Sequence, residues 1–153
     1  MLTARDIMTK EVSTIGPQAT VAELAQKLES ERINGVPVVD PEGRLVGVVT
    51  QNDLIEQARG LELPPVITLL DAHLFLERPS HFLKRLEKIM GSTVGEVMTP
   101  NPTTISPGTP VSDIASLMGR KKVHTLPVVE EGKLLGVIGK IDVIRALAPE
   151  STD

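Results

Sequence analysis

The chain has 153 residues, about the length of one ordinary domain, and 41% of them are hydrophobic. Its 20 acidic and 16 basic residues give a formal net charge of −4, and it contains two Phe, no Trp and no Tyr. An acidic chain without aromatic platforms is not expected to bind nucleic acid. The absence of Cys excludes disulfides, thiolate metal sites and Cys nucleophiles.

The sequence also bears on location. The first ten residues include three charged side chains and no apolar signal core. The most apolar stretch, residues 66–76, is interrupted by polar residues and is too short to cross a bilayer. We therefore expect a cytoplasmic protein without a membrane partner.

The first predicted elements are a short extended piece at residues 12–15 and a helix. Thr20 followed by Glu23 forms a capping box, which predicts a helix start. Leu24 and Leu28 then lie on one apolar stripe of that helix.

Two predicted strands come next, at residues 36–39 and 45–49 on either side of a turn. Their continuous apolar runs, rich in Val, are typical of strands that are buried on both faces. A second helix begins near Thr50, so this part of the chain is predicted to be β-α-β-β-α.

A helical insert follows at residues 59–90. Pro64 and Pro65 precede its first predicted helix, and Pro79 precedes a second one that Gly91 ends. The apolar faces of these helices predict either cover for the rest of the chain or an oligomer contact.

The remaining residues repeat the first part. Residues 4–9 return as residues 94–99, an offset of 90, and later segments match at an offset of 89. Residues 1–58 and 91–149 are therefore two copies of one unit, with a tail at 150–153. In the second copy Thr109 is the predicted helix cap and Pro110 the first helical residue.

The apolar stripes favour self-association. The apolar helix faces of the insert add to the stripes of the two copies, which contain Leu24, Leu28, Ile114 and Met118, and together they present more apolar surface than two small sheets are expected to cover. We therefore expect a homodimer or a higher even oligomer.

The order, spacing and duplication of several short motifs resemble the cystathionine-β-synthase (CBS) domain, and two copies in tandem resemble a Bateman module. The motifs are Asp-Ile-Met-Thr at 6–9, Gly-Val-Pro-Val-Val-Asp at 35–40, Gly-Val-Val-Thr-Gln-Asn-Asp at 47–53, and their counterparts at 96–100, 126–130 and 136–142. The resemblance implies an α/β (α+β) fold with two β-α-β-β-α repeats related by a pseudo-two-fold axis. It implies two clefts that often bind AMP, ADP, ATP or S-adenosylmethionine, dimers shaped as a four-domain disk, and a regulatory role.

Thr50 and Asp53 are the main candidate ligand-binding residues. They lie where a strand ends and a helix begins, and the free N–H groups of a helix N-terminus suit a phosphate. A hydroxyl can donate to a phosphate oxygen, and a carboxylate can accept from two ribose hydroxyls. The same Thr-x-x-Asp spacing is also that of an N-cap with a first-turn acid, which would be purely structural.

The second copy departs from this pattern. Gly139 replaces the hydroxyl residue, although Asp142 is kept. Lys140 is a candidate phosphate partner, because a bound anion would offset the cost of a cation near a helix N-terminus. His124 is another, since the kinase-regulating gamma subunits of the family place a phosphate-contacting His at its position. The alternatives are a solvated Lys140 and an uncommitted surface or core His124. Lys122 is interpreted as a solvated helix end.

By resemblance, His124 and Lys140 would serve the cleft of Thr50 and Asp53, and Asn34 is the weaker counterpart of His124. We therefore expect the two clefts to bind unequally. The full predicted ligand-binding set is Thr14, Asn34, Gly35, Val36, Pro37, Thr50, Asp53, His124, Thr125, Leu126, Pro127, Lys140 and Asp142.

Three classes of function compete. The leading hypothesis is a stand-alone regulator that binds an adenosine compound, requires no cofactor and acts on a regulated protein that the sequence does not identify. The alternative is a structural dimerisation module with empty clefts. Catalysis is not expected, since no nucleophile is paired with a base and no Walker-type loop occurs. A metal site is not expected either, because His73 and His81 lack ligand spacing.

Overall fold

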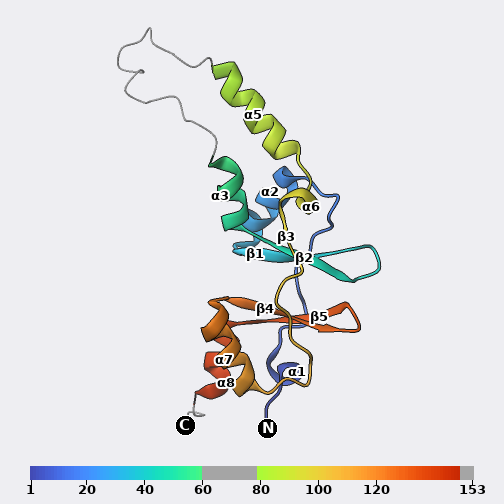
Figure 1. The fold of residues 1–153 in the computed structure, drawn as a ribbon, viewed down its shortest axis with the longest axis vertical. Helices are drawn as coiled ribbons and strands as arrows, with labels where there is room; N and C mark the ends of the chain where they lie inside the picture. The colour runs from blue at the N-terminus through green and yellow to red at the C-terminus, as the bar shows by residue number, and fades with distance from the viewer. Residues whose placement is uncertain (60–78, 149–153) are drawn as a thin grey trace, which may run out of the picture. The chain divides into compact units, whose positions relative to one another are not determined.

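The computed structural model describes residues 1–59 and 79–148 (Figure 1). The chain divides into two compact units, each made of several segments. Unit 1 consists of Met1–Thr14, Val39–Val46 and Asn101–Asp153, and unit 2 consists of Ile15–Val38 and Gly47–Pro100.

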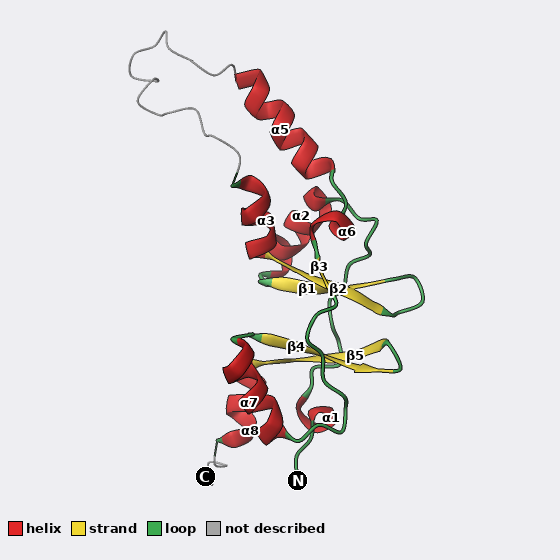
Figure 2. Ribbon diagram, in the orientation of Figure 1, coloured by secondary structure: helices red, strands yellow, loops and turns green. Residues whose placement is uncertain are grey.

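Unit 2 is built from most of the first copy of the repeat, the end of the insert and the opening segment of the second copy. Its sheet has the strand order β1-β2-β3, and α2 and α3 lie on one face of the β1–β2 hairpin (Figure 2). In chain order the elements are α2 (Val21–Glu31), β1 (Gly35–Val39), β2 (Leu45–Thr50), α3 (Gln51–Ala58), α5 (Pro79–Gly91), α6 (Val94–Val97) and β3 (Thr99–Pro100). The first two residues of β2 cluster with unit 1.

Unit 1 is built from the second copy and the N-terminal residues. Strands β4 and β5 pair antiparallel, with α7 and α8 on one face of the hairpin (Figure 2). Glu131 and Gly132, both with positive φ, form the two-residue turn between the strands. The elements are α1 (Ala4–Ile7), α7 (Val111–Lys121), β4 (Thr125–Glu130), β5 (Lys133–Gly139) and α8 (Lys140–Leu147).

The predicted mixed helix-and-sheet class with two related copies is confirmed, with one difference at the start of each copy. The extended piece predicted at residues 12–15 is not a full strand. Ile15 makes a single parallel bridge to Val38, and Ile105 makes the equivalent bridge to Val128. β2 also departs from the prediction of burial on both faces, because buried and half-buried residues alternate along it.

The opening segments of the two copies are exchanged between the units. Thr9 and Val137 exchange backbone hydrogen bonds of 2.9 and 3.0 Å in unit 1. In unit 2, β3 (Thr99–Pro100) pairs with Val48 and Gly47 of β2. Each unit therefore takes its opening segment from the other copy, which the sequence repeat did not predict.

Glycine permits both of these close approaches. A Cβ on Gly47 would lie 2.8 Å from the Thr99 carbonyl oxygen, and a Cβ on Gly136 would lie 2.7 Å from the Thr9 carbonyl oxygen. Real Cβ atoms do not approach this closely, so a side chain at either position would push the exchanged segment away.

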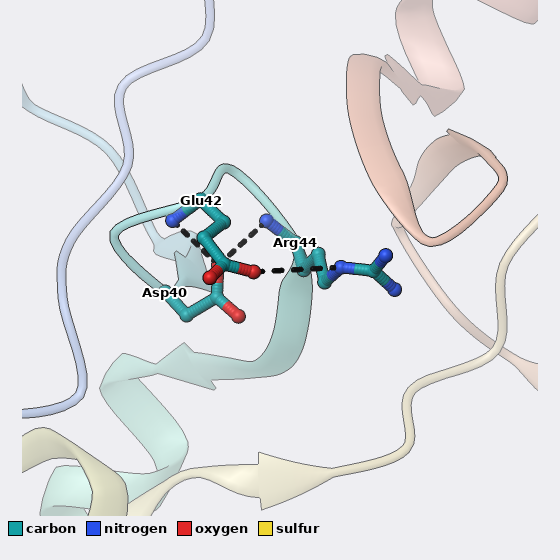
Figure 3. Close-up of polar contacts among 3 residues, drawn as sticks. All are labelled: Asp40, Glu42 and Arg44. Atoms are coloured by element: carbon teal, nitrogen blue, oxygen red, sulfur yellow. Dashed lines mark hydrogen bonds and ion pairs between the residues drawn. The ribbon is translucent and has the colours of Figure 1, made fainter.

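The turn between β1 and β2 is held by its own side chains (Figure 3). Asp40 Oδ1 accepts from the backbone N–H groups of Glu42 and Arg44, each at 2.9 Å. The Arg44 guanidinium lies 3.8 Å from the Glu42 carboxylate. An Asp side chain that accepts from the backbone N–H groups two and four residues ahead stabilises the turn.

The two cores use equivalent positions of the repeat. Leu24 and Ile114, at matching positions, are both fully buried. The core of unit 1 consists of Ala4, Ile105, Val111, Ile114, Met118, Leu126, Val128, Ile138 and Val143. The stripes that were expected to need a partner are therefore covered within one chain, since Leu28 and Met118 are also only 4% and 5% exposed.

Two predicted helix starts have different outcomes. The capping box of Thr20 and Glu23 is confirmed, with the Glu23 N–H donating to Thr20 Oγ1 at 3.1 Å. The cap predicted at Thr109 is wrong, because α7 begins at Val111 with Pro110 as its N-cap. Thr109 Oγ1 instead accepts from the Ser106 N–H at 3.2 Å, within the preceding turn.

The insert is described in its second half. The helix predicted between Pro79 and Gly91 is confirmed as α5, which contacts α2 and α3. The first predicted helix of the insert and His73 lie outside the described residues. Within residues 1–59 and 79–148, the structure has no helix long and apolar enough to cross a membrane.

Candidate ligand-binding sites

Thr50 and Asp53 form a reciprocal cap at the junction of β2 and α3 in unit 2. Asp53 Oδ2 accepts from the Thr50 N–H at 2.8 Å and from the Thr50 hydroxyl at 3.2 Å. The Asp53 N–H in turn donates to Thr50 Oγ1 at 3.4 Å. The structural role that the spacing allowed is thus real, and the half-buried carboxylate is held in one orientation.

Thr99 adds a third donor to the same carboxylate. Its hydroxyl donates to Asp53 Oδ1 at 3.4 Å, from the exchanged strand β3. A carboxylate offers about four lone-pair positions, and three of those of Asp53 are therefore in use. Sequence reasoning missed Thr99, because the exchange that brings it to Asp53 is not visible in the repeat.

Asn34 and the first residue of β1 contact the start of α3. The Asn34 carbonyl accepts from the Gln51 N–H at 2.8 Å. Gly35 faces the same junction, where a Cβ would lie 2.9 Å from Thr50 Cγ2. Val36 and Pro37 are buried, so these two predicted site residues belong to the core as well.

Unit 1 repeats this junction between β5 and α8 with one component missing. Asp142 Oδ2 accepts from the Gly139 N–H at 2.8 Å, and the His124 carbonyl accepts from the Lys140 N–H at 3.1 Å. Because Gly139 has no hydroxyl, the Asp142 N–H lacks the acceptor that Thr50 supplies to Asp53. The second junction is therefore a half-formed version of the first.

His124 and Lys140 lie together on a groove between α7 and α8. The groove has a volume of about 480 Å³ and is lined by Ala115, Met118, Gly119, Lys122, His124, Lys140, Val143 and Ile144. Lys122, interpreted from the sequence as a solvated helix end, lines this groove as a third basic side chain. An apolar floor beside three basic groups suits a partner with both apolar and acidic parts.

The other predicted residues of unit 1 are arranged along the hairpin. Thr125 is exposed and pairs with Gly139, while Leu126 and Pro127 are buried. Thr14 is half-buried at the end of the N-terminal segment. The thirteen predicted residues thus fall into two groups, one on each unit, with six in unit 2 and the rest in unit 1.

The described residues contain no group of three or more His, Asp or Glu side chains that could hold a metal ion. The side chain of His81 lies outside what the structure describes.

A comparison with models of protein families matches both copies of the repeat. The CBS domain model matches residues 4–60 and 94–149. A CBS domain-containing protein of Dictyostelium discoideum is 31% identical over 94% of this chain and 89% of its own length. The chloroplastic protein CBSX2 of Arabidopsis thaliana is 30% identical over 94% of this chain, which spans 63% of that relative's length.

Solved structures agree with the sequence comparison. The crystal structure of CBSX2 in complex with AMP matches with a TM-score of 0.73 and 29% sequence identity. The match covers 95% of this chain and 96% of the solved one.

Proposed function

The chain belongs to the CBS-domain family, and on that premise we propose that it is a non-catalytic regulatory module that binds an adenosine-containing ligand. The observation that carries the proposal is the intact Thr50–Asp53 pair at the N-terminus of α3, with the carboxylate fixed by its own cap. The AMP complex of CBSX2, a relative of the same fold, supports the class of ligand.

The proposed roles follow from the chemistry of each group. Asp53 accepts from the ribose hydroxyls, and the N-terminus of α3 at Thr50 receives a phosphate oxygen. His124 and Lys140 are assigned to the phosphate by family resemblance, and as exposed basic groups they suit an anion. AMP is the first candidate, with ADP, ATP and S-adenosylmethionine as alternatives.

A second candidate function is a structural module that assembles subunits without a ligand. Gly139 favours it for the second junction, which lacks the hydroxyl of Thr50. Under this alternative, Asp53 and Asp142 act only as helix-capping acids.

Assembly and location extend the proposal. We propose a homodimer, arranged as the four-domain disk of the family, that acts on a separate regulated protein. We also propose a cytoplasmic location.

A thermal-shift series with AMP, ADP, ATP, S-adenosylmethionine and NAD tests the proposed function, with GMP as the control for phosphate and ribose. A ligand present at about 100 times its Kd stabilises the folded state by about 2.7 kcal/mol, so AMP should raise the melting temperature in a concentration-dependent way. A melting temperature unmoved by every adenosine compound contradicts the proposal.

A further inference from the structure

Two methionine side chains pack the exchanged segments against the strands. Met98 Sδ occupies the space where a side chain at Gly47 would lie, since a Cβ on that glycine would be 2.6 Å from the sulfur. Met8 Sδ is placed in the same way on Gly136, at 3.0 Å from such a Cβ. The methionines, like the glycines, are at equivalent positions of the repeat, so the same contact is made once in each unit.

Each of these methionines precedes the residue that pairs with a strand. The Met98 N–H donates to the Val94 carbonyl at 2.8 Å and ends α6, and Thr99 then begins the pairing with β2. The Met8 N–H donates to the Ala4 carbonyl at 2.9 Å and ends α1, and the residue after it pairs with β5. A thioether that leaves its glycine therefore displaces the paired residue that follows it.

The five methionines of the chain differ in exposure. Met1 is fully exposed, and Met118 is only 5% exposed in the core of unit 1. Met8, Met90 and Met98 are half-buried. A small oxidant can therefore reach the two methionines that pack on glycine, whereas the core protects Met118.

We propose that Met8 and Met98 are sites of reversible oxidation by a peroxide, and that their oxidation releases the exchanged segments. Hydrogen peroxide transfers one oxygen atom to the thioether sulfur: its O–O bond breaks, an S–O bond forms, the sulfur loses two electrons and water leaves. The product, methionine sulfoxide, is larger and polar, whereas the thioether that it replaces is apolar and polarisable. Such a group does not fit against a glycine that the sulfur already contacts closely.

In unit 2 the modification reaches the candidate ligand-binding site. The Thr99 hydroxyl, next to Met98, donates to Asp53 Oδ1 at 3.4 Å, and release of β3 withdraws it. The inference does not depend on the proposed ligand, because release of the segments is measured on the ligand-free protein.

Peroxide treatment of the ligand-free protein, followed by peptide mass spectrometry and thermal unfolding, tests the inference. Oxidation of Met8 and Met98 should lower the melting temperature by about 3–10 °C. Reduction by the methionine sulfoxide reductases, one for each epimer of the sulfoxide, should restore both the original mass and the original melting temperature.

Leucine variants separate these two sites from the other methionines. Leu has a volume similar to that of Met and carries no sulfur, so the double variant Met8→Leu/Met98→Leu should keep its melting temperature in peroxide. Met90→Leu is the matched control, because Met90 is also half-buried but lies on α5, outside the exchanged segments. This control should lose as much melting temperature as the unchanged protein.

Three results overturn the inference. One is an equal loss of melting temperature in the unchanged protein and in the double variant. Another is oxidation that modifies Met1 and leaves Met8 and Met98 as thioethers. The third is full oxidation of Met8 and Met98 with an unchanged melting temperature.

Discussion

The Asp53 carboxylate has a structural role as a helix cap and a proposed role in ligand binding. Thr50 supplies two donors to Oδ2, and Thr99 supplies one to Oδ1. A ribose diol donates two hydrogen bonds and so needs two acceptor positions on the carboxylate. Only one of its about four positions is free while all three donors stay in place. The Thr99 hydroxyl is the donor expected to give way, because its bond is the longest of the three and comes from a two-residue strand.

Thr99→Val should therefore strengthen AMP binding by about threefold to tenfold, since it removes the competing hydroxyl and keeps the branched shape. Isothermal titration calorimetry measures the change. Thr9→Val is the matched control at the equivalent position, where the described residues show backbone pairing with Val137 and no side-chain bond. Weaker AMP binding by Thr99→Val would show that Thr99 orients Asp53 for the ligand rather than competing with it.

Residue-scale prediction from sequence succeeded where the interaction is local. The cap at Thr20 and the Thr50–Asp53 pair follow from a spacing of three residues, which fixes the geometry. The positions of Thr99 and Lys122 were missed because each depends on residues distant in sequence. Thr99 reaches Asp53 by segment exchange, and Lys122 lines the same groove as Lys140 because α7 and α8 pack together.

At the scale of elements, the exchanged segments are the feature most sensitive to substitution. Gly136→Ala should destabilise the chain by about 1–3 kcal/mol, because the new Cβ would meet the Thr9 carbonyl oxygen at 2.7 Å. Urea unfolding measures the loss. Gly108→Ala is the control, since a Cβ there meets nothing within 4 Å. Equal unfolding midpoints for the two variants would contradict the close packing of the exchanged segment.

The half-formed cap of α8 gives a second prediction at this scale. Gly139→Thr should supply the missing hydroxyl, because the nearest atoms to a new Cβ lie at the ordinary distances of 3.7 and 3.9 Å. The unchanged protein should bind AMP with one stronger and one weaker site per chain, and Gly139→Thr should strengthen the weaker one. Calorimetry showing two equal sites before the substitution would contradict the proposed inequality.

Element prediction was accurate for the helices and strands that have strong periodic signals and weaker at their edges. The strands around the first turn and the helices after Thr20 and Thr50 are present. The cap of α7 lies one residue later than predicted, because the Thr109 side chain closes the preceding turn with Ser106. The extended piece predicted at residues 12–15 is longer than the segment that pairs, because Ile15 alone makes a bridge there.

At the scale of the whole molecule, duplication preserved the cores and changed the surfaces. Leu24 and Ile114 are both buried at equivalent positions of the repeat. Glu56 and Arg145 carry opposite charges at equivalent exposed positions. Apolar periodicity predicted which positions repeat, but not that each chain covers its own stripes. The expectation that these stripes need a partner is wrong, because α6 and the N-terminal segment complete the two cores after exchange, with Val94 and Ala4 fully buried.

The central claim is that Asp53 holds a ligand in addition to capping α3, and a pair of matched variants tests it. Asp6 caps α1 in the same way, accepting from the Thr3 N–H at 2.8 Å, a bond that lowers the pKa of Asp6 below its ordinary value of 3.8. Asp53→Ala and Asp6→Ala should both lower the melting temperature of the ligand-free protein, since each removes a helix cap.

The AMP-induced shift in melting temperature, measured for both variants together with AMP affinity by calorimetry, is the decisive comparison. Asp53→Ala should lose most of the shift and bind AMP about tenfold to a hundredfold more weakly, because a hydrogen bond to a charged group contributes about 1.5–3 kcal/mol. Asp6→Ala should keep the full shift. Equal AMP-induced shifts in the two variants would contradict the account and leave Asp53 as a helix cap alone.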